Sequence, residues 1–278
     1  MLSYQHDYHA GNHADVLKHS VLAVLIRALQ RKTTPLRVID THAGSGLYDL
    51  GSAMAQHGRE YEQGVARVLA ANTPPAALTP YLEVLQRLNP GELRRYPGSP
   101  AMALSLLRQQ DHLELFELHP QALDALRDWA GREPRVHIHR RDGFEGLMAI
   151  LPPPEKRGIV LIDPAYELKT DYDRVADVLA ASCSRWSNGV FVIWYPLLRQ
   201  QGSAHLIRKI QRLGLPKVFQ VELTVAPEVE GLRGSGLIVV NLPYQIDAEL
   251  RELLPWLKLC LGKNHPGSSV AVWLTSTR

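Results

Sequence analysis

The chain has 278 residues, of which 45% are hydrophobic and 21% are charged, and its formal net charge is +3. A chain of this length can bury roughly three quarters of its unfolded surface, and this composition is ordinary for a globular enzyme. The small positive excess excludes a strongly basic protein, so any surface that binds nucleic acid must be local.

The N-terminal part predicts a helix, a short strand and a glycine turn. Asn12 can cap the helix, with Asp15 three residues later as the acid of a capping box. Apolar residues then recur at helical spacing from 14 to 28. A strand over 36–40 follows and breaks at a turn with Gly44, where the missing side chain lets a ligand approach the backbone closely.

The rest of the chain alternates between predicted strands and predicted helices. The strands cover 113–117, 136–139, 158–162, 189–195, 217–225 and 236–241, and the helices cover 99–108, 120–130, 171–185 and 203–213. This alternation predicts an α/β fold with a doubly wound, mostly parallel, seven-stranded sheet that is covered on both faces.

One spacing is too long for a minimal Rossmann unit. The acid that closes the second strand should follow the glycine turn by about 20 residues, but Glu117 lies much further along the chain. We therefore predict a single domain over 1–278 that contains a small helical insertion over 50–97.

Three acids follow three successive strands: Glu117, Asp142 and Asp163. Because ligands of open parallel sheets bind beyond the carboxyl ends of the strands, we expect these carboxylates to face one cleft. A carboxylate after the second strand can accept both ribose hydroxyls, and Asp142 can accept an adenine amine. A single acid at a strand end is more often a helix cap, but three in order with the glycine turn favour an adenosyl-type cofactor.

The chemistry is predicted at Asp163-Pro164-Ala165-Tyr166, directly after a buried strand. The stretch closely resembles the Asp-Pro-Pro-Tyr motif of amino-group methyltransferases, with Ala165 in place of the second proline. Hydrogen bonds to the Asp163 carboxylate and the Pro164 carbonyl would draw an adenine amine towards tetrahedral geometry, so that its lone pair can attack a methyl group. Tyr166 would stack on a base removed from its helix.

Other candidate sites are weaker. Asn241 to Tyr244 could also hold an amine, but its place after the seventh strand favours a structural turn. The histidines near the N-terminus have no cluster of cysteines or acids beside them, so we predict no metal site. Cys183 and Cys260 lie far apart, which argues against a disulfide scaffold. The first residues lack a signal-peptide pattern, and no apolar run reaches the roughly 18 residues of a membrane span, so we expect a cytoplasmic protein without a membrane partner.

The order of these parts resembles the RlmJ family of bacterial 23S ribosomal RNA adenine-N6 methyltransferases. The resemblance covers essentially the whole chain and rests on the segments 4–19, 40–46, 96–100, 117–120 and 163–166. It implies a Rossmann-like fold that depends on S-adenosyl-L-methionine, with a helical insertion. It also implies methyl transfer to one adenine of 23S ribosomal RNA, and we expect a monomer.

The resemblance also implies roles for single residues. The cofactor contacts would be Lys18, His19, His42, Ser99, Glu117, Asp142, Gly143 and Asp163, to which the turn adds Gly44. Asp163 matches the catalytic acid and acts with Pro164 and Tyr166, while Tyr4 and Tyr166 would meet the substrate.

Two alternatives remain open at this point. The first is methylation of adenine in DNA or of a glutamine amide in a protein. The presence of an acid rather than asparagine at position 163 favours adenine over the amide. The second is an RNA-binding factor without catalysis, against which the intact Glu117 and Asp142 argue.

Overall fold

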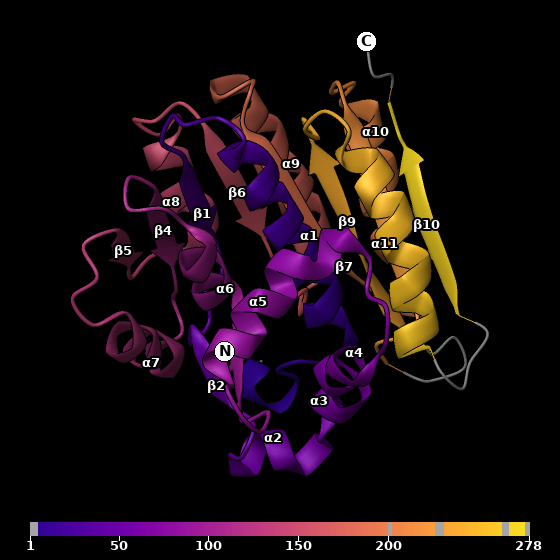
Figure 1. The fold of residues 1–278 in the computed structure, drawn as a ribbon. Coiled ribbons are helices and arrows are strands. Elements are labelled where there is room, and N and C mark those ends of the chain that lie inside the picture. Colours follow the sequence, from indigo (N-terminus) through magenta and orange to yellow (C-terminus); the bar gives the residue numbers. More distant parts are fainter. Residues whose placement is uncertain (1–4, 200–201, 226–230, 263–266, 276–278) are drawn as a thin grey trace.

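A computed structural model describes residues 5–199, 202–225, 231–262 and 267–275 (Figure 1). Its centre is an eight-stranded sheet in the order β10-β8-β9-β7-β6-β1-β4-β5. The strands are β1 (Arg37–Asp40), β4 (His112–Phe116), β5 (Val136–His139), β6 (Gly158–Ile162), β7 (Val190–Leu197), β8 (Val218–Thr224), β9 (Gly234–Val240) and β10 (Ser268–Trp273). Five neighbouring strands are parallel to one another: β5, β4, β1, β6 and β7. The other three strands, β9, β8 and β10, join by antiparallel pairing. The predicted fold class is confirmed, with one more strand than the seven predicted.

The register of the central strands explains why the predicted acids meet. Val38 of β1 pairs with Leu113 of β4 on one side and with Ile159 of β6 on the other. The strand order reverses between β1 and β6, which makes this edge a topological switch point, where open α/β sheets bind ligands. The residues that follow β1, β4 and β6 therefore lie around one crevice.

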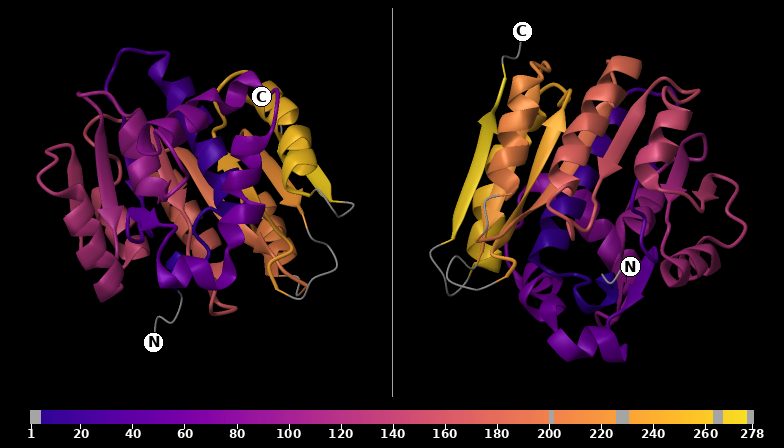
Figure 2. Two further views of the ribbon diagram at one scale, coloured as in Figure 1. Left: turned by 60° about the horizontal axis from the view of Figure 1, so that its bottom comes forward. Right: turned by 180° about the vertical axis from the view of Figure 1, so that it is seen from behind.

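Helices cover both faces of the sheet (Figure 2). They are α1 (His13–Gln30), α6 (Ser99–Leu106), α7 (Pro120–Ala130), α8 (Gly143–Ile150), α9 (Asp171–Arg185), α10 (Gly202–Arg212) and α11 (Ile246–Leu261). One buried apolar cluster joins α1, α6 and α11 to one face, and a second joins α8, α9 and α10 to the other. Nearly all of α1 is buried, so its polar residues are enclosed by the fold as well. No helix of the described residues is long and apolar enough to cross a membrane.

Short elements fill the N-terminal segment and the region between β1 and α6. They are η1 (His6–Tyr8), β2 (Leu47–Asp49), α2 (Ala53–Gly58), α3 (Glu60–Gln63), α4 (Val65–Ala70), η2 (Ala76–Leu78), α5 (Thr79–Leu88) and β3 (Arg95–Pro97), with β2 and β3 paired antiparallel. Gly64 separates the helices α3 and α4, and a Cβ atom there would lie 2.0 Å from the Gly11 carbonyl oxygen. This close approach brings α3 against the start of α1. The division of the chain into one domain and an insertion over 50–97 stays a prediction.

Candidate active site

A cavity of about 1180 Å³ opens at the carboxyl edge of the parallel strands. It brings together the predicted residues Lys18, His19, His42, Gly44, Ser99, Glu117, Asp142, Gly143, Asp163, Pro164 and Tyr166. Tyr4, the other predicted substrate contact, lies outside the described residues. Ligand pockets for small molecules usually measure roughly 300–1,000 Å³, so this cavity has room for a nucleoside cofactor together with a base.

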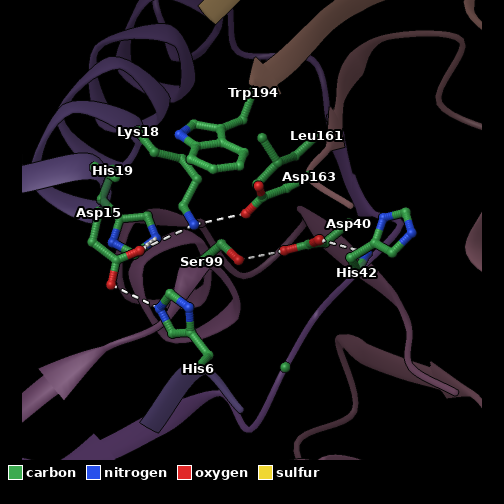
Figure 3. A network of polar contacts seen from close by, with 12 residues as sticks. His6, Asp15, Lys18, His19, Asp40, His42, Ser99, Leu161, Asp163 and Trp194 are labelled. Atoms are coloured by element: carbon green, nitrogen blue, oxygen red, sulfur yellow. Dashed lines mark hydrogen bonds and ion pairs between the residues drawn. The ribbon is translucent and has the colours of Figure 1, made fainter. Parts of the chain in front are cut away.

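Lys18 lies between two carboxylates in the floor of this cavity (Figure 3). Its Nζ is 2.7 Å from Oδ2 of Asp163 and 3.0 Å from Oδ1 of Asp15. His6 Nε2 approaches the other Asp15 oxygen at 2.8 Å. Burial raises the pKa of Asp15, but the interactions with His6 and Lys18 outweigh burial and hold this pKa well below its usual range. Lys18 therefore shares its charge between two carboxylates and ties α1 to the turn after β6.

The turn after β6 presents acceptors to the cavity. Oδ1 of Asp163 and the carbonyl of Pro164 accept no hydrogen bond from any described residue. Tyr166 has a left-handed backbone with φ of 53°, and its hydroxyl donates to the Trp194 carbonyl at 2.6 Å. Its ring is only 8% exposed and lies 4.6 Å from the ring of Tyr172. Stacking of Tyr166 on a base stays a prediction, because the ring is largely covered in this arrangement.

The end of β1 holds a buried acid that the sequence prediction did not include in the site. Asp40 accepts hydrogen bonds from the Ser99 hydroxyl at 2.6 Å and from the His42 backbone N–H at 3.1 Å. Burial raises the pKa of Asp40 to about 6, against the lowering effect of these two hydrogen bonds. Burial also lowers the pKa of His42 to about 4, so its imidazole is neutral at pH 7. Asp40 thus positions two predicted cofactor contacts, Ser99 and His42.

Glu117 is held by the backbone more firmly than its predicted ribose role requires. Its Oε2 accepts from the Gly44 N–H at 2.8 Å, while Oε1 accepts from Leu118 at 2.8 Å and His119 at 2.7 Å. A carboxylate offers about four acceptor sites, so these three leave one on Oε2. Glu117 therefore fastens the glycine turn to the end of β4 and keeps limited capacity for a hydroxyl group.

Asp142 begins α8 and keeps one oxygen open. Its Oδ1 accepts from the backbone N–H groups of Phe144 at 3.0 Å and Glu145 at 3.2 Å, and from the Arg174 guanidinium at 3.0 Å. Arg174 also lies 4.5 Å from the centre of the Phe144 ring. No described residue donates to Oδ2, which is consistent with the predicted contact to an adenine amine.

Two glycines allow the backbone to close around the cavity. At Gly143 a Cβ atom would lie 1.8 Å from the Thr41 carbonyl oxygen, so only glycine lets α8 begin against the turn after β1. Gly44 has φ of 62°, and a Cβ there would lie 2.5 Å from the Tyr48 hydroxyl. Each glycine is therefore required by a contact within the protein, independently of any ligand.

The sequence prediction omitted Asp15 and Arg174, which line the cavity, and Asp40, which contacts the cavity residues Ser99 and His42. The acidic end of a strand before a glycine turn is a signal that could have identified Asp40. Asp15 carried a signal too, but a capping role explained it, and in the structure the Asn12 side chain caps α1. Arg174 offered no signal, because its partner Asp142 lies on a different element.

The second amine-binding candidate lies at the opposite edge of the sheet. Asn241 follows β9, whose Val240 pairs with Phe191 near the start of β7. The Asn241 side-chain amide donates to the carbonyls of Ser187 and Gly189 at 2.9 and 2.7 Å. This motif is a structural turn, as predicted.

Two of the N-terminal histidines, His6 and His9, pair with acids. His9 Nδ1 lies 2.8 Å from Glu60, whose other oxygen accepts from the Asn12 amide at 2.9 Å. Among the described residues, no group of three or more histidines, cysteines or acids is placed to hold a metal ion. These contacts join the start of α1 to α3 at the wall of the cavity.

The reversed strand order at β1, the glycine turn and the strand-end acids define a Rossmann-like methyltransferase fold. A family model described as ribosomal RNA large subunit methyltransferase D, RlmJ, matches residues 33–275. Two proteins named ribosomal RNA large subunit methyltransferase J are similar over 99% of both chains, at 42% identity from Escherichia coli (strain K12) and 39% from Haemophilus influenzae (strain ATCC 51907). A crystal structure of a Legionella pneumophila protein has a TM-score of 0.89 at 35% identity, with 95% of this chain and 98% of that chain covered. The chain belongs to the RlmJ family of large-subunit ribosomal RNA methyltransferases.

Proposed function

We propose that this protein transfers a methyl group from S-adenosyl-L-methionine to the N6 amine of one adenine in 23S ribosomal RNA. The observation that carries the proposal is the state of Asp163. One of its oxygens is held by Lys18 at 2.7 Å, and the other has no hydrogen-bond donor among the described residues, in a residue that lines the cavity. A carboxylate in this state can accept a hydrogen bond from an exocyclic amine.

The residues around the cavity fit this cofactor. Asp142 Oδ2 is open to an adenine amine, Glu117 keeps an acceptor for a ribose hydroxyl, and the glycine turn at Gly44 lies between them. Lys18, His19, His42, Ser99 and Gly143 complete the proposed contacts. When bound, S-adenosylmethionine supplies an electrophilic methyl group on a positively charged sulfur.

Asp163 and Pro164 provide the acceptors for the amine. The lone pair of an adenine amine is delocalised into the ring, so the nitrogen is a poor nucleophile. Hydrogen bonds to Asp163 Oδ1 and to the Pro164 carbonyl favour a tetrahedral nitrogen whose lone pair points to the methyl group. As the nitrogen becomes positive, its attraction to the carboxylate increases, and such interactions typically contribute about 3–4 kcal/mol.

Lys18 keeps Asp163 suited to this role. Its ammonium holds one oxygen of the carboxylate and so fixes which oxygen faces the cavity. Because Asp15 shares the same ammonium, the position of Lys18 does not depend on Asp163 alone.

The target adenine has to leave its base stack to reach this cavity. We propose that Tyr4 and Tyr166 contact the extruded base. Under this proposal the enzyme acts as a monomer in the cytoplasm, where its ribosomal RNA substrate is assembled into subunits.

Methyl transfer to three acceptors in parallel tests this function. Labelled S-adenosylmethionine is incubated with protein-free ribosomal RNA, with duplex DNA and with a cell protein extract, and Asp163→Ala serves as the inactive control. We expect label in large-subunit RNA, recovered as N6-methyladenosine, and none with the variant. Label only in DNA or only in protein would show that the substrate is not ribosomal RNA. Near-normal activity of Asp163→Ala would refute the mechanism.

A further inference from the structure

A chain of buried hydroxyl groups leads from α5 to the floor of the cavity. The hydroxyl of Tyr81 lies 3.3 Å from that of Tyr96, which in turn lies 3.0 Å from Nδ1 of His19. Both tyrosines are fully buried, and His19 is 1% exposed. Burial raises the pKa of each phenol and lowers the pKa of His19 to about 3, so all three groups are neutral at pH 7.

The direction of this chain follows from a count of its protons. If Tyr96 donates to His19 Nδ1, Tyr81 can donate to Tyr96, and both phenolic protons have an acceptor. If His19 donates instead, Tyr96 must donate to Tyr81, and the Tyr81 proton then has no acceptor among the described residues. Each arrangement leaves one buried donor without a hydrogen bond, the His19 Nε2–H in the first and the Tyr81 hydroxyl in the second, and such a donor costs about 1–3 kcal/mol. The second arrangement also turns the Nε2 lone pair towards the Asp15 carboxylate at 4.0 Å, whereas the first turns an N–H towards it, so the first arrangement is preferred. A neutral imidazole nitrogen is also a better acceptor than a phenol oxygen.

This direction decides where the His19 proton is. Because Nδ1 accepts from Tyr96, the neutral ring carries its proton on Nε2. His19 Nε2 makes no hydrogen bond in the described structure, and its nearest acid is Asp15 Oδ1 at 4.0 Å. His19 lines the cavity, so this N–H is a buried donor beside a ligand site.

We propose that Tyr96 is a positioning residue that fixes His19 in the Nε2–H tautomer, so that His19 donates to the carboxylate of the cofactor's amino-acid part. The identity of the ligand rests on the proposed function, whereas the tautomer does not. An acceptor is what an N–H donor requires, and the amino-acid carboxylate is the strongest acceptor that this cofactor offers.

Tyr81 provides a matched control for Tyr96. It has the same buried phenol one hydrogen bond further from His19. In Tyr81→Phe, Tyr96 still donates to Nδ1, because reversal would leave the Tyr96 proton without an acceptor and would turn the Nε2 lone pair towards the Asp15 carboxylate. In Tyr96→Phe, no donor faces Nδ1, and the two tautomers compete.

Nitrogen NMR of protein labelled with ¹⁵N-histidine reports the tautomer directly, and His19→Gln assigns the signal. Without ligand, we expect the His19 proton on Nε2 in the wild type and in Tyr81→Phe, and a shift towards Nδ1 in Tyr96→Phe. Calorimetry then compares S-adenosylhomocysteine with 5′-methylthioadenosine, which lacks the amino-acid part. Tyr96→Phe should weaken the first about tenfold, corresponding to one hydrogen bond, and leave the second unchanged.

Three results would overturn the inference: a wild-type His19 with its proton on Nδ1, equal effects of Tyr96→Phe and Tyr81→Phe, or equal losses for both ligands. The wild-type spectrum needs no variant to fold. Absence of methyl transfer to RNA together with the expected spectra and affinities would refute the proposed function and leave this inference intact.

Discussion

The Lys18 ammonium is 2.7 Å from the Asp163 carboxylate, although 145 positions separate the two residues in the chain. The contact joins the helix that begins the fold to the turn that follows β6. Lys18 and Asp163 are both largely buried, with side chains that are 8% and 14% exposed. Removal of one partner from such a pair leaves a charge without compensation, which usually costs more than the pair itself contributes.

We therefore predict that Lys18→Met damages both activity and stability. Asp163 and Asp15 would face each other without the shared cation, so the free energy of unfolding should fall by roughly 3 kcal/mol. Methyl transfer should fall by about 100-fold or more, because the acceptor geometry is lost. Denaturant unfolding and single-turnover assays measure the two effects. Lys32→Met, on an exposed residue after α1, is the control, and a Lys18→Met variant as active as this control would contradict the prediction.

The second prediction concerns Asp40 and pH. The pKa of this acid is about 6 in the folded protein and about 3.8 when unfolded. An acid with a raised pKa favours the folded state while it is protonated, and this contribution is lost as the pH rises from about 4 to about 6. Asp40→Asn removes the buried charge and should raise the free energy of unfolding at pH 8 by up to about 3 kcal/mol.

The same Asp40→Asn substitution should have little effect at pH 4, where the wild-type acid is already neutral. Denaturant unfolding at the two pH values gives the comparison. Asp49→Asn, at a half-exposed position, should show no such difference. An equal effect of Asp40→Asn at both pH values would rule out the buried charge as its cause.

Glu117→Ala should weaken binding of S-adenosylmethionine about tenfold or more. The substitution removes the proposed ribose acceptor and also the acceptor that holds the Gly44 N–H. Hydrogen bonds to a charged group contribute about 1.5–3 kcal/mol each. Titration calorimetry measures the dissociation constant, with Glu92→Ala on an exposed loop as the control. An unchanged constant would refute the ribose role.

Ala165→Pro should stabilise the protein modestly and preserve activity. Ala165 is exposed, and its backbone N–H donates to no described residue, so proline removes no hydrogen bond. Proline restricts the unfolded chain and typically adds about 0.4–1 kcal/mol at a compatible position. Thermal and denaturant unfolding test this gain. A destabilised variant would mean that the turn adopts a backbone angle that proline cannot reach.

Local patterns in the sequence were sufficient to predict the central fold. The strand before Asp163 is a continuous apolar run, and each acid after a parallel strand necessarily reaches the same edge of the sheet. β10 was not predicted, since its residues are only partly buried at the edge of the sheet. α11 contains Pro255, which weakens a helical pattern, yet it forms because Leu250, Leu253 and Leu257 pack into the core.

The partners of the site residues depended on contacts that no local pattern contains. The sequence predicted that Glu117 faces the ligand, but the direction of its carboxylate towards three backbone N–H groups is set by the path of the chain after β4. The same limit applies to Lys18, whose partner Asp163 comes from the other side of the fold. Long-range pairing of this kind requires the assembled sheet.

The ends of α1 are anchored to separate parts of the molecule. Asn12 bonds to Glu60 at one end, and Gln30 donates to the Leu106 carbonyl and to Asp111 at the other. Each residue of an α-helix turns the chain by about 100°, so one residue added before Lys18 would rotate the ammonium away from Asp163 or break an anchor. The length of α1 therefore determines whether the Lys18 ammonium points towards Asp163. Insertions and deletions among functional relatives should fall in the exposed loop after Gln30 and be absent from the helix itself.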